Sequence, residues 1–166
     1  MGDRILLLNG ASSSGKSTLA YNLQKIIKYK KNYEYGVVSI DDFLKMKTDE
    51  KIYEDDVYEI SSKLCRKSIE ILDSKEGIII DYVITSERIF NQLIDTFKQY
   101  DIYLIQVTCP LEKLIERERQ RKDRCIGSAE ESYRYLFPKE GYYLTVDTSQ
   151  SSMEECALKI IDAIVS

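Results

Sequence analysis

The apolar positions of the chain form short, largely continuous runs that alternate with longer stretches in which apolar residues recur at helical spacing. Runs of this kind indicate strands buried on both faces. The predicted strands cover residues 4–8, 36–40, 77–80, 102–107 and 144–146. The predicted helices cover residues 17–28 and 55–74, a segment from Ser86 to Phe97, a segment that begins at Pro110, and a segment after Ser152. Strict alternation of strands and helices predicts an α/β fold with a parallel sheet covered on both faces.

Capping signals mark the start of two of these helices. Ser86 is expected to cap the helix that follows it, and Ser152 with Glu155 forms a capping box. Residues 45–54 and 123–141 are the least patterned stretches, and both are candidates for mobile segments. We therefore predict a single domain over residues 1–166, with a mobile, arginine-rich lid around residues 117–141.

Length and composition fit a soluble globular protein. A chain of 166 residues can bury one full core, and 43% hydrophobic with 31% charged residues is ordinary for such a protein. No apolar run approaches the about 20 residues of a membrane span, and the N-terminal run is too short for a signal peptide. The predictions that follow are a cytoplasmic location and no membrane partner.

Charge and reactive residue types narrow the chemistry further. The net charge of −4 argues against a nucleic-acid partner. Four widely spaced cysteines without a C-x-x-C pattern favour reduced thiols over a disulfide or zinc framework. The chain contains no histidine, which excludes imidazole bases, Ser-His-Asp triads and histidine-ligated metals. Any proton transfer must therefore use a carboxylate, a lysine, a tyrosine or water.

Residues 10–17 (GASSSGKS) fit the phosphate-binding pattern G-x-x-x-x-G-K-[ST]. They lie between a predicted strand and a predicted helix, which is the context that this loop requires; the alternative is an ordinary serine-rich turn. The backbone N–H groups and Lys16 would bind the phosphates, and the Ser17 hydroxyl would bind Mg²⁺. The predicted ATP-binding residues are Gly10, Ala11, Ser12, Ser13, Ser14, Gly15, Lys16, Ser17, Thr18 and Arg121.

Acidic residues follow two other predicted strands. Ligands of open α/β sheets bind at the carboxyl ends of the strands, where Asp41, Asp42 and Asp81 are expected. An apolar strand that ends in aspartate can hold Mg²⁺, so Ser17 and Asp81 are the predicted metal ligands. Asp41 and Asp42 could cap a short helix, or Asp41 could be the general base that accepts the proton of a substrate hydroxyl. Both roles can hold at once, with Asp42 as the cap and Asp41 catalytic.

Basic residues crowd into residues 117–124. Some of them alternate with glutamates, which is typical of a solvated helix face with i,i+4 ion pairs. A transferring phosphoryl group, however, needs cations over it, and the guanidinium fork fits phosphate oxygens. Arg121 and Arg124 border the glycine-bearing segment 125–128, and we predict that they act on phosphate together with Lys16. The chain has no N-K-x-D motif of GTPases and no S-G-G-Q-like signature of ABC ATPases, which favours a small-molecule kinase.

Several segments together resemble the chloramphenicol phosphotransferase-like family of P-loop kinases. They are residues 5–17 (ILLLNGASSSGKS), 39–43 (SIDDF), 78–83 (IIIDYV), 107–110 (VTCP), 117–127 (RERQRKDRCIG), 146–149 (VDTS) and 155–157 (ECA). The spacing R-E-x-x-R-x-D-R-x-x-G and the V-D-T-S…E-C-A ending are particular to this family. The resemblance covers nearly the whole chain. Residues 137–145 depart from the family, which often has a His-Gly pair there and an Asp where this chain has Tyr143.

The resemblance implies an adenylate-kinase-like, three-layer α/β/α P-loop NTPase fold around a five-stranded parallel sheet. It also implies transfer of the γ-phosphate of ATP to a primary hydroxyl, with chloramphenicol as the namesake acceptor. The family's base falls on Asp41, its Mg²⁺ and phosphate region on Asp81, and its phosphate-binding arginines around Arg121 and Arg124. ATP and Mg²⁺ are the expected cofactors, and the expected partner is a small hydroxyl compound.

Two alternatives remain at this point. One is a P-loop kinase that acts on another metabolite, a nucleoside or a sugar nucleotide. The other is a non-catalytic module that binds ATP and signals its presence to a partner. The two acidic strand ends and the arginines argue against the second, because a sensor needs no general base.

Overall fold

The described residues form a five-stranded parallel sheet, which confirms the predicted α/β architecture. The structure is a computed structural model and describes residues 4–44, 54–121 and 126–165. The strands are β1 (Arg4–Asn9), β2 (Tyr35–Ser39), β3 (Gly77–Tyr82), β4 (Asp101–Thr108) and β5 (Leu144–Asp147). Their order across the sheet is β2-β3-β1-β4-β5, and each neighbouring pair is parallel.

Helices connect the strands. They are α1 (Lys16–Lys31), α2 (Ile40–Leu44), α3 (Glu54–Leu72), α4 (Glu87–Thr96), α5 (Leu111–Gln120), α6 (Ser128–Tyr135) and α7 (Met153–Val165). Both predicted caps are confirmed, because the Ser86 hydroxyl accepts from the Ile89 N–H, and Ser152 and Glu155 bond each other's N–H groups. Helix α6 is an addition to the prediction, since its sequence lies in the stretch that showed no clear pattern.

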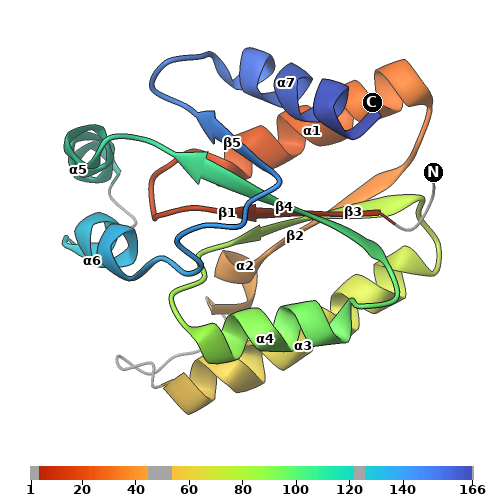
Figure 1. Cartoon of the computed structure of the whole chain (residues 1–166), viewed down its shortest axis with the longest axis horizontal. Helices are drawn as coiled ribbons and strands as arrows, with labels where there is room; N and C mark the ends of the chain where they lie inside the picture. Colours follow the sequence, from red (N-terminus) through yellow and green to blue (C-terminus); the bar gives the residue numbers. More distant parts are fainter. Residues whose placement is uncertain (1–3, 45–53, 122–125, 166) are drawn as a thin grey trace.

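The core has two layers, one on each face of the sheet. Alternate residues of β1 point to opposite faces: Leu6 and Leu8 pack with α1 and α7, and Ile5 and Leu7 pack with α3 and α4. Figure 1 shows α1 and α7 on one side of the sheet and α3 with α4 on the other. Helices α5 and α6 lie beyond the carboxyl ends of the strands. In this three-layer arrangement a ligand-binding site can form at the carboxyl ends of the strands.

Strand β1 lies at the point where the strand order reverses. It pairs with β3 on one side and β4 on the other, while the chain leaving β1 runs through α1 to β2 at the sheet edge. The connections that leave β1 and β3 therefore go to opposite faces of the sheet, through α1 on one face and α4 on the other, and such switch points form the binding crevices of open α/β sheets. The loop between β1 and α1 sits in this position.

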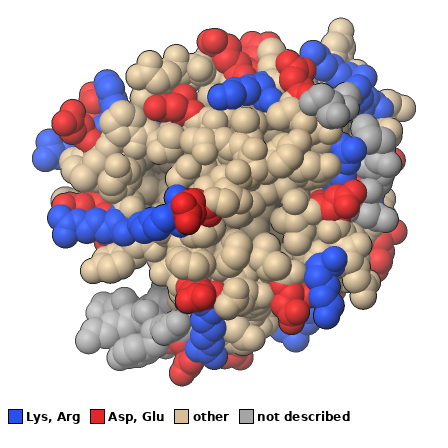
Figure 2. Space-filling model, viewed as in Figure 1, with Lys and Arg blue, Asp and Glu red and all other residues tan. Residues whose placement is uncertain are grey.

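The surface carries charges of both signs. On the face shown in Figure 2, lysines, arginines, aspartates and glutamates surround a largely uncharged centre, and neither sign forms a continuous patch there. In the described parts of the chain, no helix has both the length and the apolar character needed to cross a membrane.

Candidate active site

The loop between β1 and α1 folds as a tight turn that needs its glycines. A Cβ atom on Gly10 would lie 2.2 Å from the Val107 carbonyl oxygen of β4, so the strand and the loop could not approach as they do. Gly15 precedes α1 with a φ of 97°, a conformation that other residues adopt only with strain. The chain thereby turns directly from β1 into the N-terminus of α1, which is the geometry of an anion-binding loop.

Lys16 folds over this loop. Its side chain is 6% exposed, and its Nζ atom donates to the Ala11 carbonyl oxygen at 3.0 Å and to the Ser14 hydroxyl at 3.4 Å. These hydrogen bonds hold the ammonium group against the turn. The structure places all the predicted ATP-binding residues of the loop, 10–18, in this one turn and the start of α1.

Two hydroxyl groups and a carboxylate meet beside the loop. Asp81, 3% exposed at the end of β3, accepts hydrogen bonds from Ser17 at 2.5 Å and from Ser39 at 3.1 Å. The structure therefore brings the two predicted metal ligands, Ser17 and Asp81, into direct contact. Their hard oxygen atoms fit Mg²⁺, which prefers such donors and keeps several waters of its own. Ser39, at the end of β2, is an addition that the sequence did not reveal.

A cavity of about 560 Å³, here called the loop cavity, opens over these groups. Its walls include Lys16, Ser17, Asp81, Arg117, Arg121 and Met153. A second cavity of about 490 Å³ adjoins it and is called the tyrosine cavity. Ile40, Leu44, Val57, Tyr82, Thr85 and Tyr135 line it. The two cavities share Ser12, Asp41 and Val83, so a group bound in one can reach a group bound in the other.

Asp41 stands at this junction. It belongs to the first turn of α2, together with Asp42. The helix begins at Ile40, so the interpretation of these aspartates as N-caps is wrong; both lie inside the helix, where its dipole still favours a carboxylate. Asp41 is half-buried and lines both cavities, whereas Asp42 is exposed and lines neither of them. This is the position that a base between two substrates requires.

Arg117 contacts the phosphate loop. Its guanidinium donates to the carbonyl oxygens of Ser13 and Ser14, both at 3.3 Å. It also donates to the hydroxyl of Thr148 at 3.0 Å and to the carbonyl oxygen of Thr148 at 3.1 Å. Arg117 therefore joins the phosphate loop to the turn after β5. Sequence reasoning favoured Arg121 and Arg124; Arg121 lines the loop cavity, and Arg124 lies outside the described residues.

Helix α6 is fastened to the site at two points. The Glu118 carboxylate, 4% exposed, accepts from the N–H groups of Gly127 and Ala129 and so caps the start of α6. The Ser132 hydroxyl accepts from the Ser12 N–H at 2.9 Å. Glu118 is one of the glutamates that alternate with the basic residues of 117–124, and for it the expectation of a solvated face is wrong, because it points inward with Leu114, one helical turn away. One backbone N–H of the phosphate loop, that of Ser12, therefore binds α6.

A buried asparagine holds three segments together at the carboxyl ends of the strands. Asn9, fully buried at the end of β1, donates from Nδ2 to the Phe137 carbonyl oxygen at 2.9 Å and to the Tyr142 hydroxyl at 3.0 Å. Its Oδ1 atom accepts from the Ile84 N–H at 2.9 Å. Residues 137–142, where the chain departs from the family pattern, are therefore anchored to β1 without histidine.

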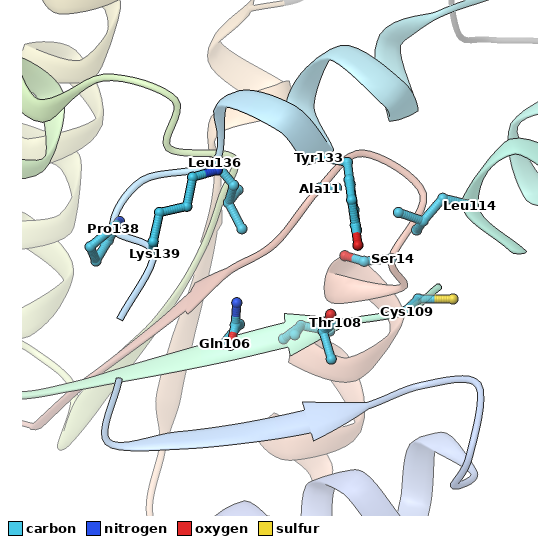
Figure 3. A pocket seen from close by; sticks show the side chains of 11 residues that line it. Ala11, Ser14, Gln106, Thr108, Cys109, Leu114, Tyr133, Leu136, Pro138 and Lys139 are labelled. Carbon is cyan, nitrogen blue, oxygen red and sulfur yellow. The ribbon is translucent and has the colours of Figure 1, made fainter. Parts of the chain in front are cut away.

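A smaller cavity of about 240 Å³ lies between β4 and α6. Figure 3 shows Tyr133 of α6 pointing across it toward Ser14, with Gln106 and Thr108 on the β4 side. Cys109 also lines this cavity, and burial raises the pKa of its thiol. Cys65, Cys109 and Cys156 are buried free thiols, and the described residues hold no group of three or more His, Cys, Asp or Glu side chains that could bind a metal.

Comparison with known families shows which protein family the chain belongs to. Residues 3–165 match the chloramphenicol phosphotransferase-like protein family. The chain belongs to this family. The match spans nearly the whole sequence and confirms the resemblance carried by the separate motifs. A search of curated proteins by sequence finds no match.

Solved structures with the same fold include an APS kinase and a gluconokinase. The APS kinase CysC of Mycobacterium tuberculosis, in complex with AMPPNP and APS, is 16% identical with a TM-score of 0.79, and the alignment covers 99% of both chains. A gluconokinase from Sinorhizobium meliloti is 15% identical with a TM-score of 0.73 and 98% and 92% coverage of this chain and its own. YorR of Bacillus subtilis, in complex with phosphorylated GDP, is 23% identical with a TM-score of 0.62 and 96% and 95% coverage. At these identities the likeness shows the fold, a P-loop NTPase α/β sandwich, and the family with its kinase neighbours supports a P-loop kinase.

Proposed function

We propose that the protein transfers the γ-phosphate of ATP to a hydroxyl group of a small molecule. The observation that carries this proposal is the junction of the two cavities, where Asp41 stands between a phosphate-binding loop and a mainly apolar hollow. Family membership and the kinase neighbours support the same reaction class. The triphosphate binds in the loop cavity and the acceptor in the tyrosine cavity.

The residues around the loop cavity stabilise the negative charge of the phosphates. In the proposed reaction the acceptor oxygen forms a bond to the γ-phosphorus, the bond from that phosphorus to the β,γ-bridging oxygen breaks, and ADP leaves. Lys16 and the loop amides stabilise the charge that develops on the phosphate oxygens. Arg121 faces the same cavity and is the described arginine placed to approach the transferring group. Arg117 holds the loop in shape through its four hydrogen bonds.

The metal site follows from the hydroxyl and carboxylate beside the loop. Ser17 and Asp81 would hold Mg²⁺, which supplies neutralisation of the β- and γ-phosphate oxygens when ATP is bound. Ser39 keeps the Asp81 carboxylate in place by its own hydrogen bond. Positioning and electrostatics carry most of the catalysis in reactions of this kind.

Asp41 accepts the proton of the acceptor hydroxyl in this proposal. The chain has no histidine, and the other carboxylate beside the loop, Asp81, already accepts from two hydroxyl groups. Asp41 is the carboxylate that lines both cavities. Its place in the first turn of α2 fixes the carboxylate relative to the sheet.

Two measurements on the purified protein test the proposal. Calorimetry with Mg²⁺ and AMPPNP measures nucleotide binding, and release of ADP from ATP is then followed with and without hydroxyl acceptors, chloramphenicol among them. The expected result is nucleotide binding together with ADP release that depends on the acceptor. Binding without acceptor-dependent release from any compound of a broad panel would favour a signalling module, and no nucleotide binding at all would overturn the assignment.

A further inference from the structure

The two adjoining cavities differ in their charged side chains. Lys16, Arg117 and Arg121 line the loop cavity together with Asp41 and Asp81, so both signs are present there. Among the described residues, the charged side chains that line the tyrosine cavity are those of Asp41 and Glu131, and both are acidic. Among the residues that the structure describes, no lysine or arginine faces the tyrosine cavity.

We propose that the tyrosine cavity selects hydroxyl acceptors that carry an apolar body and a protonated amine. This inference rests on the proposed phosphotransferase function. The apolar body fits the side chains of Ile40, Leu44 and Val57, and a volume of about 490 Å³ suits a drug-sized molecule. The amine is recognised by Glu131 at the rim.

Glu131 is placed to meet a ligand. It is an exposed residue of α6 at the rim of the cavity, and its carboxylate makes no hydrogen bond or ion pair within the described residues. The backbone of Glu131 is fixed, because its N–H bonds the Gly127 carbonyl oxygen and α6 is anchored through Glu118 and Ser132. The carboxylate therefore extends from a fixed backbone position at the rim of the cavity.

Tyr135 adds a second contact for the same group. It belongs to α6, one helical turn after Glu131, and 63% of it is exposed while it lines the cavity. An ammonium group over a tyrosine ring is attracted by the ring's negative face. An acceptor with a carboxylate or phosphate would instead face two like charges and lose hydration without compensation. The cavity thus discriminates between acceptors by the sign of their charge.

The namesake compound of the family offers a matched set of probes. Chloramphenicol is a neutral amide, its deacylated amino-diol carries a protonated amine, and the N-succinyl derivative of that amino-diol carries a carboxylate. The three share the aromatic ring and the hydroxyl groups. We expect kcat/KM, measured by ADP release, to be three- to tenfold higher for the amine than for the neutral amide, and lowest for the succinyl derivative. The size follows from a partly exposed carboxylate–ammonium pair.

Two variants assign the preference to one carboxylate. Glu131→Gln is expected to bring the amine and the neutral amide within twofold of each other. Glu130→Gln is the control, since Glu130 lies on the same helix, pairs with Arg134 and does not line the cavity; it should leave the preference unchanged. Equal melting temperatures of the two variants would show that the fold is intact.

Calorimetry with the same three compounds, in the presence of Mg²⁺ and AMPPNP, separates the two proposals. Tighter binding of the amine, abolished by Glu131→Gln, supports the inference even if turnover is slow. A preference for the neutral or the anionic compound, no binding of the amine, or a preference that survives Glu131→Gln would overturn it. Phosphorylation of a neutral acceptor alone would leave the phosphotransferase function standing and remove only the charge selection.

Discussion

The loop cavity and the tyrosine cavity touch at three residues but are built in different ways. The loop cavity is shaped by backbone and by buried polar groups: the turn into α1, the Ser17–Asp81–Ser39 hydrogen bonds and the Arg117 guanidinium. The tyrosine cavity is shaped by side chains of α2, α3 and α6 over the end of β3. In the proposed reaction the first set of residues binds the phosphates, whereas the second set faces the acceptor.

This difference separates the general part of the site from its specific part. Binding a triphosphate requires donors at fixed positions, and a rigid turn at a helix N-terminus supplies them. Choosing an acceptor requires shape, apolar area and charge, which side chains on short helices can change without disturbing the sheet. Substitutions in one cavity should therefore leave binding in the other cavity intact.

Asp41→Asn should have the largest effect, because it removes the proposed base where the two cavities meet. Loss of a general base lowers the rate by about 10²–10⁴-fold. Transfer in a single turnover should fall by this factor, while calorimetry should show AMPPNP binding within a few-fold of the native protein.

Asp42→Asn supplies the matched control for Asp41. Asp42 lies in the same turn of α2, is exposed and lines neither of the two cavities. Its amide variant should keep transfer near the native rate. If Asp41→Asn transferred phosphate at the native rate, Asp41 would not be the base.

Lys16→Ala should lower transfer by about 10²–10³-fold, the effect of removing one positioned charge donor from a phosphoryl-transfer site. Nucleotide binding should weaken as well, because the ammonium group interacts with phosphate in the ground state. Acceptor affinity, measured by calorimetry without nucleotide, should stay unchanged. A parallel loss of acceptor binding with an unchanged melting temperature would contradict the separation of the two cavities.

The sequence predicted the rigid half of the site well. A glycine-bearing loop between a strand and a helix has one local structure, so residues 10–18 could be placed from their spacing, and Asp81 could be placed near them because it ends an apolar strand. The centre of the sheet was predictable for a related reason, since β1 and β3 are continuous apolar runs buried on both faces. The long periodic helix α3 was predicted within two residues at each end, and the end of α1 was predicted three residues too early.

The contacts made by α5 and α6 were harder to predict. Helix α6 has eight residues, and its buried residues are Ala129 and Ser132, so no apolar period marks it. Arg117 could not be told from its basic neighbours by composition. Its spacing from Leu114 was the available signal, because residues three and four positions after a buried leucine share its helix face and point inward.

Ser12 and Ser13 offer a finer test of the boundary between the cavities. Both residues are 7% exposed, and neither hydroxyl has a hydrogen-bond partner within the described residues. Ser12 lines both cavities, whereas Ser13 lines the loop cavity and not the tyrosine cavity. Ser12→Ala should lower kcat about tenfold, as for one lost hydrogen bond of about 1.4 kcal/mol to the transferring group.

Ser13→Ala is the matched control, with the same atoms removed at the same burial. It should leave kcat for the acceptor nearly unchanged, and any effect should fall on the KM for ATP. Equal losses of kcat in the two variants would mean that the Ser12 hydroxyl has no special position at the boundary.

Asp147→Asn should have the smallest effect of these substitutions, a loss of folding stability. Its carboxylate accepts from the N–H of Ser149 at 2.8 Å and from the Ser149 hydroxyl at 2.6 Å, and these hydrogen bonds lower its pKa below the ordinary value near 3.8. A lowered pKa in the folded state stabilises the protein above the pKa of the unfolded chain, and this stabilisation is lost as the pH falls through the lower, folded value. Asp147→Asn should therefore cost about 0.5–1.5 kcal/mol at pH 7, the contribution of a hydrogen bond, and progressively less below pH 4. Urea unfolding of both proteins between pH 7 and pH 3 measures the difference in their free energies of unfolding. If this difference stayed constant over the range, ionisation of Asp147 would have no part in the stability of the turn that positions Thr148 against Arg117.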